Sequence, residues 1–144
     1  MSLDIFLSAL TDDEAALFDR AIVVRAFKAI AVDQIGGHWN LRTPKGEMTS
    51  ATISVADQPR ISHFSANRPP GYGYFPEFWN AMFDVLQQTR TVLFWPAGGP
   101  KPHCCLANPD VIPHVPESLI EAIGEPALVT SGAQIDALLE RSLS

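Results

Sequence analysis

Residues 75–96 read FPEFWNAMFDVLQQTRTVLFWP. Their apolar residues first follow the spacing of a helix and then form the continuous run of a strand. Pro76 suits the first position of a helix, because its φ is already helical and its missing N–H would have no helical acceptor. Helical spacing then gathers the large apolar side chains into one stripe, formed by Phe75, Phe78, Trp79, Met82, Phe83 and Leu86. The next run, TVLFWP, is almost wholly apolar, as is typical of a strand buried on both faces. The segment therefore predicts a helix followed by a strand that is buried on both faces.

Towards the N-terminus, the sequence predicts a short strand and then a helix. Residues 3–9, LDIFLSA, are typical of a short first strand. In residues 18–31 the apolar side chains recur at helical spacing, which predicts a helix. Asp12 or Asp13 could cap its start, since acids near a helix N-terminus interact favourably with the dipole.

The middle of the chain changes to the period of a strand. Residues 38–42 and 47–56 predict two strands of a hairpin that turns at TPKG. Within the second strand Ala51, Ile53 and Val55 alternate with polar residues, so they share one face. Residues 61–67 predict a third strand, which ends at the following Pro-Pro-Gly because proline lacks the ladder donor.

The C-terminal third predicts short strands and helices in alternation. Residues 103–107 predict a strand that neighbours 91–96, and Pro116 opens a short helix that stops at Gly124. Residues 127–131 predict a last short strand. Ser131 and Gln134 have the spacing of a capping box, with Ile135, Leu138 and Leu139 on the apolar side of a final helix.

Together these segments predict one α+β domain over residues 1–144. It contains a mainly antiparallel sheet of about five to seven short strands, with about four helices packed on it. Most connections allow more than one strand pairing, so strand order stays open.

Charge is distributed unevenly along the chain. The net charge is −6, and residues 73–144 carry only three Lys/Arg against eight Asp/Glu. Nucleic-acid binding needs a basic stripe, and none is present, so nucleic acid is not an expected partner. An acidic half could attract a basic partner, or it could simply keep the protein in solution.

Membrane and secretory signals are not recognised in the sequence. No apolar run approaches the length that spans a bilayer, and the N-terminal residues lack the basic start of a secretory signal. Two adjacent cysteines cannot form a disulfide framework, which suggests a reducing compartment. We therefore expect a cytoplasmic protein without a membrane partner.

Residues 94–105, FWPAGGPKPHCC, are the one stretch that resembles a chemical centre. In a strand His103 and Cys105 could share a face, but two ligands are too few for a zinc site, so we expect no metal or other cofactor. A reactive thiol would need a lowered pKa, whereas Cys104 and Cys105 are typical of small buried core residues. One alternative stays open: a small-molecule site or small enzyme with a pocket near Trp95, His103 and Cys105.

Residues 67–79, NRPPGYGYFPEFW, are the strongest candidate for contact with a partner. The predicted helix accounts for Phe78 and Trp79, but Tyr72 and Tyr74 lie in the loop ahead of it. Tyr and Arg are enriched at interface centres because they bury area and keep a polar group. In the alternative interpretation, the loop folds back over the core with the tyrosines as its lid.

The sequence motifs of hydrolases, zinc proteases and phosphate-binding loops are absent.

Five strings in the chain carry a resemblance to a known group of proteins: DIFL (4–7), NRPP (67–70), FWNAMFDVLQQT (78–89), VLFWPAGGP (92–100) and LVTSGAQI (128–135). With them the chain resembles small bacterial proteins that are encoded beside polymorphic or contact-dependent toxins and are similar to immunity proteins. The resemblance implies a non-enzymatic cytosolic inhibitor that binds one toxin domain without a cofactor.

We therefore expect a protein partner, in particular a basic toxin domain that acidic residues could capture electrostatically. The oligomeric state stays open, and so does an interaction module unrelated to toxins. The expected contact residues are Arg68, Tyr72, Tyr74, Glu77, Asp84, Glu117 and Glu121.

Overall fold

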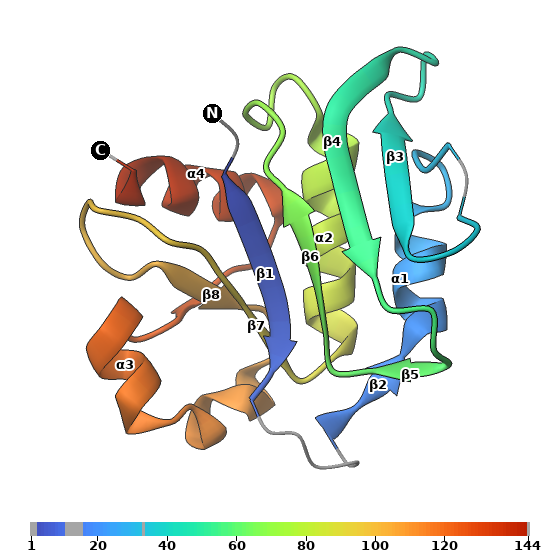
Figure 1. The fold of residues 1–144 in the computed structure, drawn as a ribbon. Coiled ribbons are helices and arrows are strands. Elements are labelled where there is room, and N and C mark those ends of the chain that lie inside the picture. The colour runs from blue at the N-terminus through green and yellow to red at the C-terminus, as the bar shows by residue number, and fades with distance from the viewer. Residues whose placement is uncertain (1–2, 11–15, 33, 144) are drawn as a thin grey trace.

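A seven-stranded sheet forms the centre of the molecule, in a computed structural model that describes residues 3–10, 16–32 and 34–143 (Figure 1). The strands lie in the order β3-β4-β6-β1-β7-β8-β9. Their bounds are β1 (Asp4–Ala9), β3 (His38–Arg42), β4 (Met48–Val55), β6 (His63–Asn67), β7 (Thr91–Phe94), β8 (Cys104–Leu106) and β9 (Ala127–Leu128). All neighbours are antiparallel except β8 and β9, so the predicted α+β class with a mainly antiparallel sheet is confirmed.

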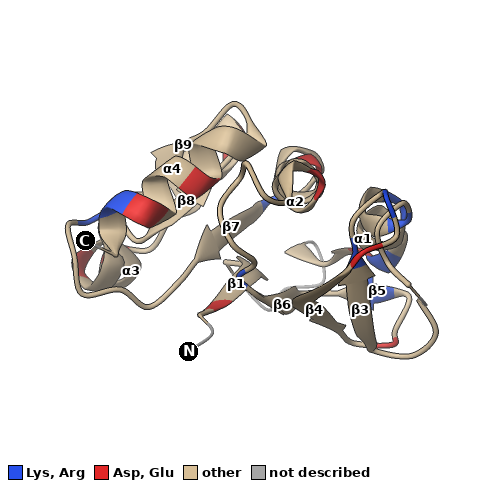
Figure 2. Ribbon diagram, turned by 90° about the horizontal axis from the view of Figure 1, so that it is seen from above, with Lys and Arg blue, Asp and Glu red and all other residues tan. Residues whose placement is uncertain are grey.

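Helices cover the two faces of the sheet unequally. They are α1 (Arg20–Phe27), α2 (Pro76–Gln88), α3 (Glu117–Ile123) and α4 (Gly132–Ser142), with a 3-10 helix, η2 (Pro109–His114). Helices α1, α2 and α4 lie in a row along one side of the sheet (Figure 2). Helix α3 packs its Ile123 against the other face of β7 and β8. None of the helices in the described ranges is long and apolar enough to cross a membrane.

Strand alternation separates the core into two parts. In β7, Leu93 points into the main core with Trp79 of α2, whereas Val92 points to the opposite face and joins a smaller apolar cluster. In β8, Cys105 belongs to the main core and Cys104 to the smaller cluster. Adjacent side chains on a strand point to opposite faces, so β7 and β8 are covered on both sides, as the apolar run 91–96 predicts.

The strands β3, β4, β6 and β1 leave their second face open. On this face a row of side chains runs across the sheet through the registered pairs His38–Ser54, Ser54–Ser65 and Ser65–Phe6. Its residues are polar apart from Phe6, which is 36% exposed. The core side of the same strands carries Trp39, Ile53 and other buried apolar residues. This in–out alternation explains how an antiparallel sheet can face water on one side.

Two local predictions differ from the structure at the start of α1. The helix begins at Arg20, because Phe18–Asp19 form a short strand, β2, paired with β5 (Arg60–Ile61). Asp19 occupies the N-cap position without a side-chain capping bond. The suggested caps, Asp12 and Asp13, lie outside the described residues.

Helix α4 has the predicted cap with one change. The Ser131 hydroxyl accepts the Gln134 N–H at 3.3 Å, as in a capping box. The Gln134 side chain does not reach back to Ser131, because its Oε1 instead accepts the Thr130 N–H at 2.7 Å. The strand before this cap is β9, which is shorter than the predicted 127–131.

Candidate functional site

The loop between β6 and α2 is fixed by an ionic network that joins it to α4. Arg68 Nη2 lies 3.2 Å from Asp136 Oδ1 and also contacts the Glu140 carboxylate. The guanidinium stands over the Trp79 ring, 6.0 Å from its centroid. The side chains of Arg68 and Asp136 are only 15% and 13% exposed, so this pair is largely removed from water. Arg68, an expected contact residue, is therefore engaged within the protein.

Asp136 also orders the backbone of the loop. Its Oδ2 accepts the Tyr72 N–H at 2.8 Å, and the Tyr74 N–H donates to the Gly71 carbonyl at 2.9 Å. The Asp136 carboxylate thus binds the Arg68 side chain at the start of the loop and the Tyr72 N–H at its middle. The loop is held by α4 rather than lying free on the surface.

The two tyrosines of the loop have different environments. Tyr72 packs against the main core, and its hydroxyl donates to Asn80 Oδ1 at 3.3 Å. It therefore acts partly as the lid of the core. Tyr74 is 51% exposed, and it is the aromatic side chain that the loop presents to solvent.

Helix α2 continues this surface with acidic side chains. Glu77 and Asp84 are seven residues apart, which places them on the same side of the helix about 10 Å from each other along its axis. Asn80 lies between them on that side. Neither acid belongs to an ion pair within the part of the chain that the structure describes. We call Tyr74, Glu77, Asn80 and Asp84 the Tyr74 surface.

Glu117 and Glu121 lie elsewhere. Both are exposed on α3, whose Ile123 packs on the opposite face of the sheet from α2. The ribbon positions of the acidic residues accordingly lie on separate parts of the fold (Figure 2). Tyr72 and Tyr74 lie in the loop before α2, and Glu77 and Asp84 lie on α2 itself, whereas Glu117 and Glu121 lie on α3. The seven expected contacts therefore do not form one flat interface.

The stretch FWPAGGPKPHCC has a structural role in this fold. Trp95 Nε1 donates to Ser142 Oγ at 2.7 Å, and the His103 ring donates through Nε2 to the Gly99 carbonyl at 2.9 Å. The Gly99 N–H donates to the Ser142 carbonyl, which attaches the loop to the end of α4. No group of three His, Cys, Asp or Glu residues in the described ranges could hold a metal ion.

The three residues of the alternative site, Trp95, His103 and Cys105, line neither of two hollows in the described part of the chain. All three side chains are buried, and Cys105 is completely enclosed. Other residues line these two hollows, which are a shallow cleft beside Arg20 and an apolar groove beside α3.

Burial also makes the two thiols unreactive. It raises the pKa of Cys104 to about 11, and it raises the pKa of Cys105 further, with the neighbouring Cys104 adding to the effect. Since the thiolate is the nucleophile, both groups are inert at neutral pH. This arrangement matches the interpretation of the pair as small core residues.

We predict that a thiol reagent such as Ellman's reagent at pH 8 labels the native protein at least ~100-fold more slowly than the unfolded chain. The native thiols stay protonated, whereas unfolded cysteines ionise near pH 8.5, so unfolding releases protons above that pH. The stability that the protonated thiols contribute is complete below about pH 8.5 and is lost as pH rises towards 11. Labelling in denaturant serves as the control, and equal rates in both states would contradict buried thiols.

Comparison with protein-family models, with curated proteins and with solved structures finds no match to this chain.

Proposed function

We propose that this protein is a non-enzymatic binding protein that contacts a basic protein partner through the Tyr74 surface. One observation carries the proposal: Tyr74 is 51% exposed on a loop that Asp136 holds in place. In its specific form the proposal is a cytosolic immunity protein that binds and neutralises a toxin domain. That form is supported by the resemblance of the sequence strings to toxin-immunity proteins.

Physical chemistry favours a fixed, exposed tyrosine as an interface anchor. Tyr buries a large area with few rotatable bonds, and a loop that is already ordered loses little further entropy on binding. Glu77 and Asp84 supply charge that a basic partner would complement. Such charges mainly accelerate association, while the aromatic anchor slows dissociation.

We predict that Tyr74→Ala weakens binding to the protein encoded by the adjacent gene about ten- to hundredfold, because truncating an interface anchor removes its buried area. Isothermal titration with the purified pair measures the change. Ile112→Ala, which truncates an equally exposed apolar side chain in η2, is the matched control and should bind normally.

The charges are tested on the same pair by stopped-flow kinetics. Glu77→Gln with Asp84→Asn should lower the association rate and its dependence on salt, and Glu47→Gln in the β3–β4 turn should change neither.

Protection of cells that express the neighbouring protein tests the proposal that this is an immunity protein. If the two proteins do not bind and cells are not protected, the immunity form is wrong. If they bind and Tyr74→Ala has no effect, this surface is wrong.

A further inference from the structure

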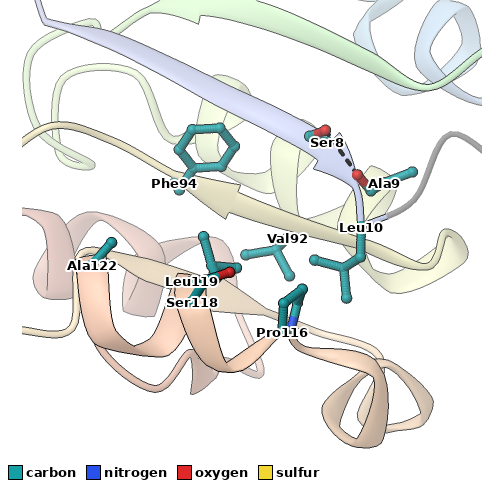
Figure 3. A pocket seen from close by; sticks show the side chains of 9 residues that line it. All are labelled: Ser8, Ala9, Leu10, Val92, Phe94, Pro116, Ser118, Leu119 and Ala122. Carbon is teal, nitrogen blue, oxygen red and sulfur yellow. Dashed lines mark hydrogen bonds between the residues drawn. The ribbon is translucent and has the colours of Figure 1, made fainter.

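An apolar groove lies between α3 and the strands β1 and β7 (Figure 3). Val92 in its wall belongs to the apolar cluster on the face of the sheet opposite α2, which carries most of the Tyr74 surface. Its volume is about 360 Å³. Val92 and Phe94 of β7 form one wall together with the end of β1, and Pro116, Leu119 and Ala122 on the α3 side form the other. The groove arises because α3 is short and has no fully buried residue of its own.

The lining of the groove is mainly apolar, and its described polar side chains are the hydroxyls of Ser8 and Ser118. None of its described lining residues is charged. The Ser8 hydroxyl already donates to the Ala9 carbonyl at 2.9 Å (Figure 3). Small-molecule sites of this size usually combine an apolar wall with a few convergent polar groups. An apolar side chain that belongs to a larger partner needs only the wall.

The groove continues into an exposed aromatic pair. Phe94 stacks on Phe6 of β1, with ring centroids 5.5 Å apart and planes 26° apart. Phe6 is 36% exposed on the open face of the sheet. An aromatic face beside a groove can take an arginine guanidinium, which stacks on such rings.

The charge around α3 indicates which kind of partner fits. Between Lys101 and Arg141 the chain contains six acids and no Lys or Arg. Asp136 and Glu140 contact Arg68, but the other four belong to no ion pair in the described part of the chain: Asp110, Glu117, Glu121 and Glu125. The Lys101 ammonium is close by, and it donates to the backbone carbonyl of Glu121.

We propose that this groove binds a protein segment in which an apolar side chain is flanked by Lys or Arg. The apolar side chain lies between Leu119 and Phe94, and the basic neighbours lie towards Glu117 and Glu121. A second copy of this chain is the weaker candidate, because its net charge of −6 would oppose the acids around α3. In this proposal Glu117 and Glu121, which lie outside the Tyr74 surface, contact the basic residues of the segment bound in the groove.

Selection of random peptides displayed on phage against the folded protein, with counter-selection against Ala122→Trp, tests the proposal. Ala122 is an exposed residue of the groove wall, so a tryptophan there fills the groove without entering the core. Ala137→Trp is the matched control, because Ala137 is an exposed alanine on α4. Thermal unfolding checks that both variants fold.

The expected result is enrichment of peptides that combine a large apolar residue with Lys or Arg. A synthetic peptide of that kind should lose about tenfold in affinity or more with Ala122→Trp, which corresponds to the loss of a well-packed apolar contact. It should also bind more weakly to Glu117→Gln with Glu121→Gln and at high salt. Binding to Ala137→Trp should equal that of the wild type.

Three results would overturn the proposal. Peptides that bind wild type and Ala122→Trp equally would show that the groove is not used. Enriched peptides without basic residues would show that the acids have no role. Dimerisation of the wild type in sedimentation experiments, lost in Ala122→Trp, would show that the groove is occupied by a second copy. Because the Tyr74 surface lies on the other face, each of these results leaves the proposed function to be judged separately.

Discussion

Arg68→Met is expected to lower the free energy of unfolding by about 3–5 kcal/mol, because it leaves the Asp136 carboxylate buried without its counter-charge. Asp136 would keep only the Tyr72 N–H as a described partner. Methionine retains much of the apolar contact with the Trp79 ring, so the loss reports mainly on the charge. Urea denaturation followed by tryptophan fluorescence measures the change, since Trp79 is fully buried beside the substitution.

Two further variants separate the charge from general effects of the substitution. Arg25→Met removes an exposed arginine from α1 and should cost less than about 0.5 kcal/mol. Adding Asp136→Asn to Arg68→Met should recover part of the loss, because it removes the uncompensated carboxylate. If the free energy of unfolding of Arg68→Met differs from that of the wild type by less than about 1 kcal/mol, the Arg68–Asp136 pair is not a main interaction that holds the loop.

Gly132→Ala is expected to destabilise the protein by about 2 kcal/mol. Gly132 begins α4 where that helix meets α2, and an added Cβ would lie 2.6 Å from the carbonyl carbon and 2.7 Å from the carbonyl oxygen of Trp79. Alanine is intrinsically about 1 kcal/mol better than glycine within a helix, but the obstacle is backbone that cannot rotate away. Overpacking of this kind costs about 1–3 kcal/mol, and the separation of α2 from α4 adds to it.

Gly73→Ala is the matched control for this prediction. A Cβ at Gly73 would meet nothing within 4 Å, and its φ is not in the left-handed region. The substitution should therefore be neutral or slightly stabilising, because it restricts the unfolded chain. Equal thermal midpoints for Gly132→Ala and Gly73→Ala would contradict the close contact between α2 and α4.

Local periodicity was sufficient to predict most of the elements. The helix at 76–88, the strand at 91–94 and the hairpin of β3 and β4 all lie within predicted segments. Each depends on which side chains share a face, and that is decided within a few residues. The strand pair β2–β5 was missed because each strand has two residues, too few to show any period.

The candidate site was predicted in part. Exposure of Tyr74 ahead of an acidic helix agrees with the expectation of a presented aromatic residue, whereas its role in binding remains a proposal. Arg68 turns inward because Asp136 and Glu140, far along the chain, approach it on α4. The sequence contained no local signal for that pairing. The groove was missed for the same reason, because its walls come from β1, β7 and α3.

Taken alone, the sequence determined the α+β class, the order of its longer helices and strands, and the acidic character of the C-terminal half. Periodicity and composition are properties of short windows or of totals, so no tertiary contact is needed to read them. Only the tertiary structure decided that β1 lies between β6 and β7, with Ile5 beside Ala66 and Leu7 beside Leu93. Several antiparallel partners satisfy the same alternation, and the choice depends on the packing of the whole core. The tertiary structure also puts α2 and α3 on opposite faces of the sheet, and so divides the acidic residues between two surfaces.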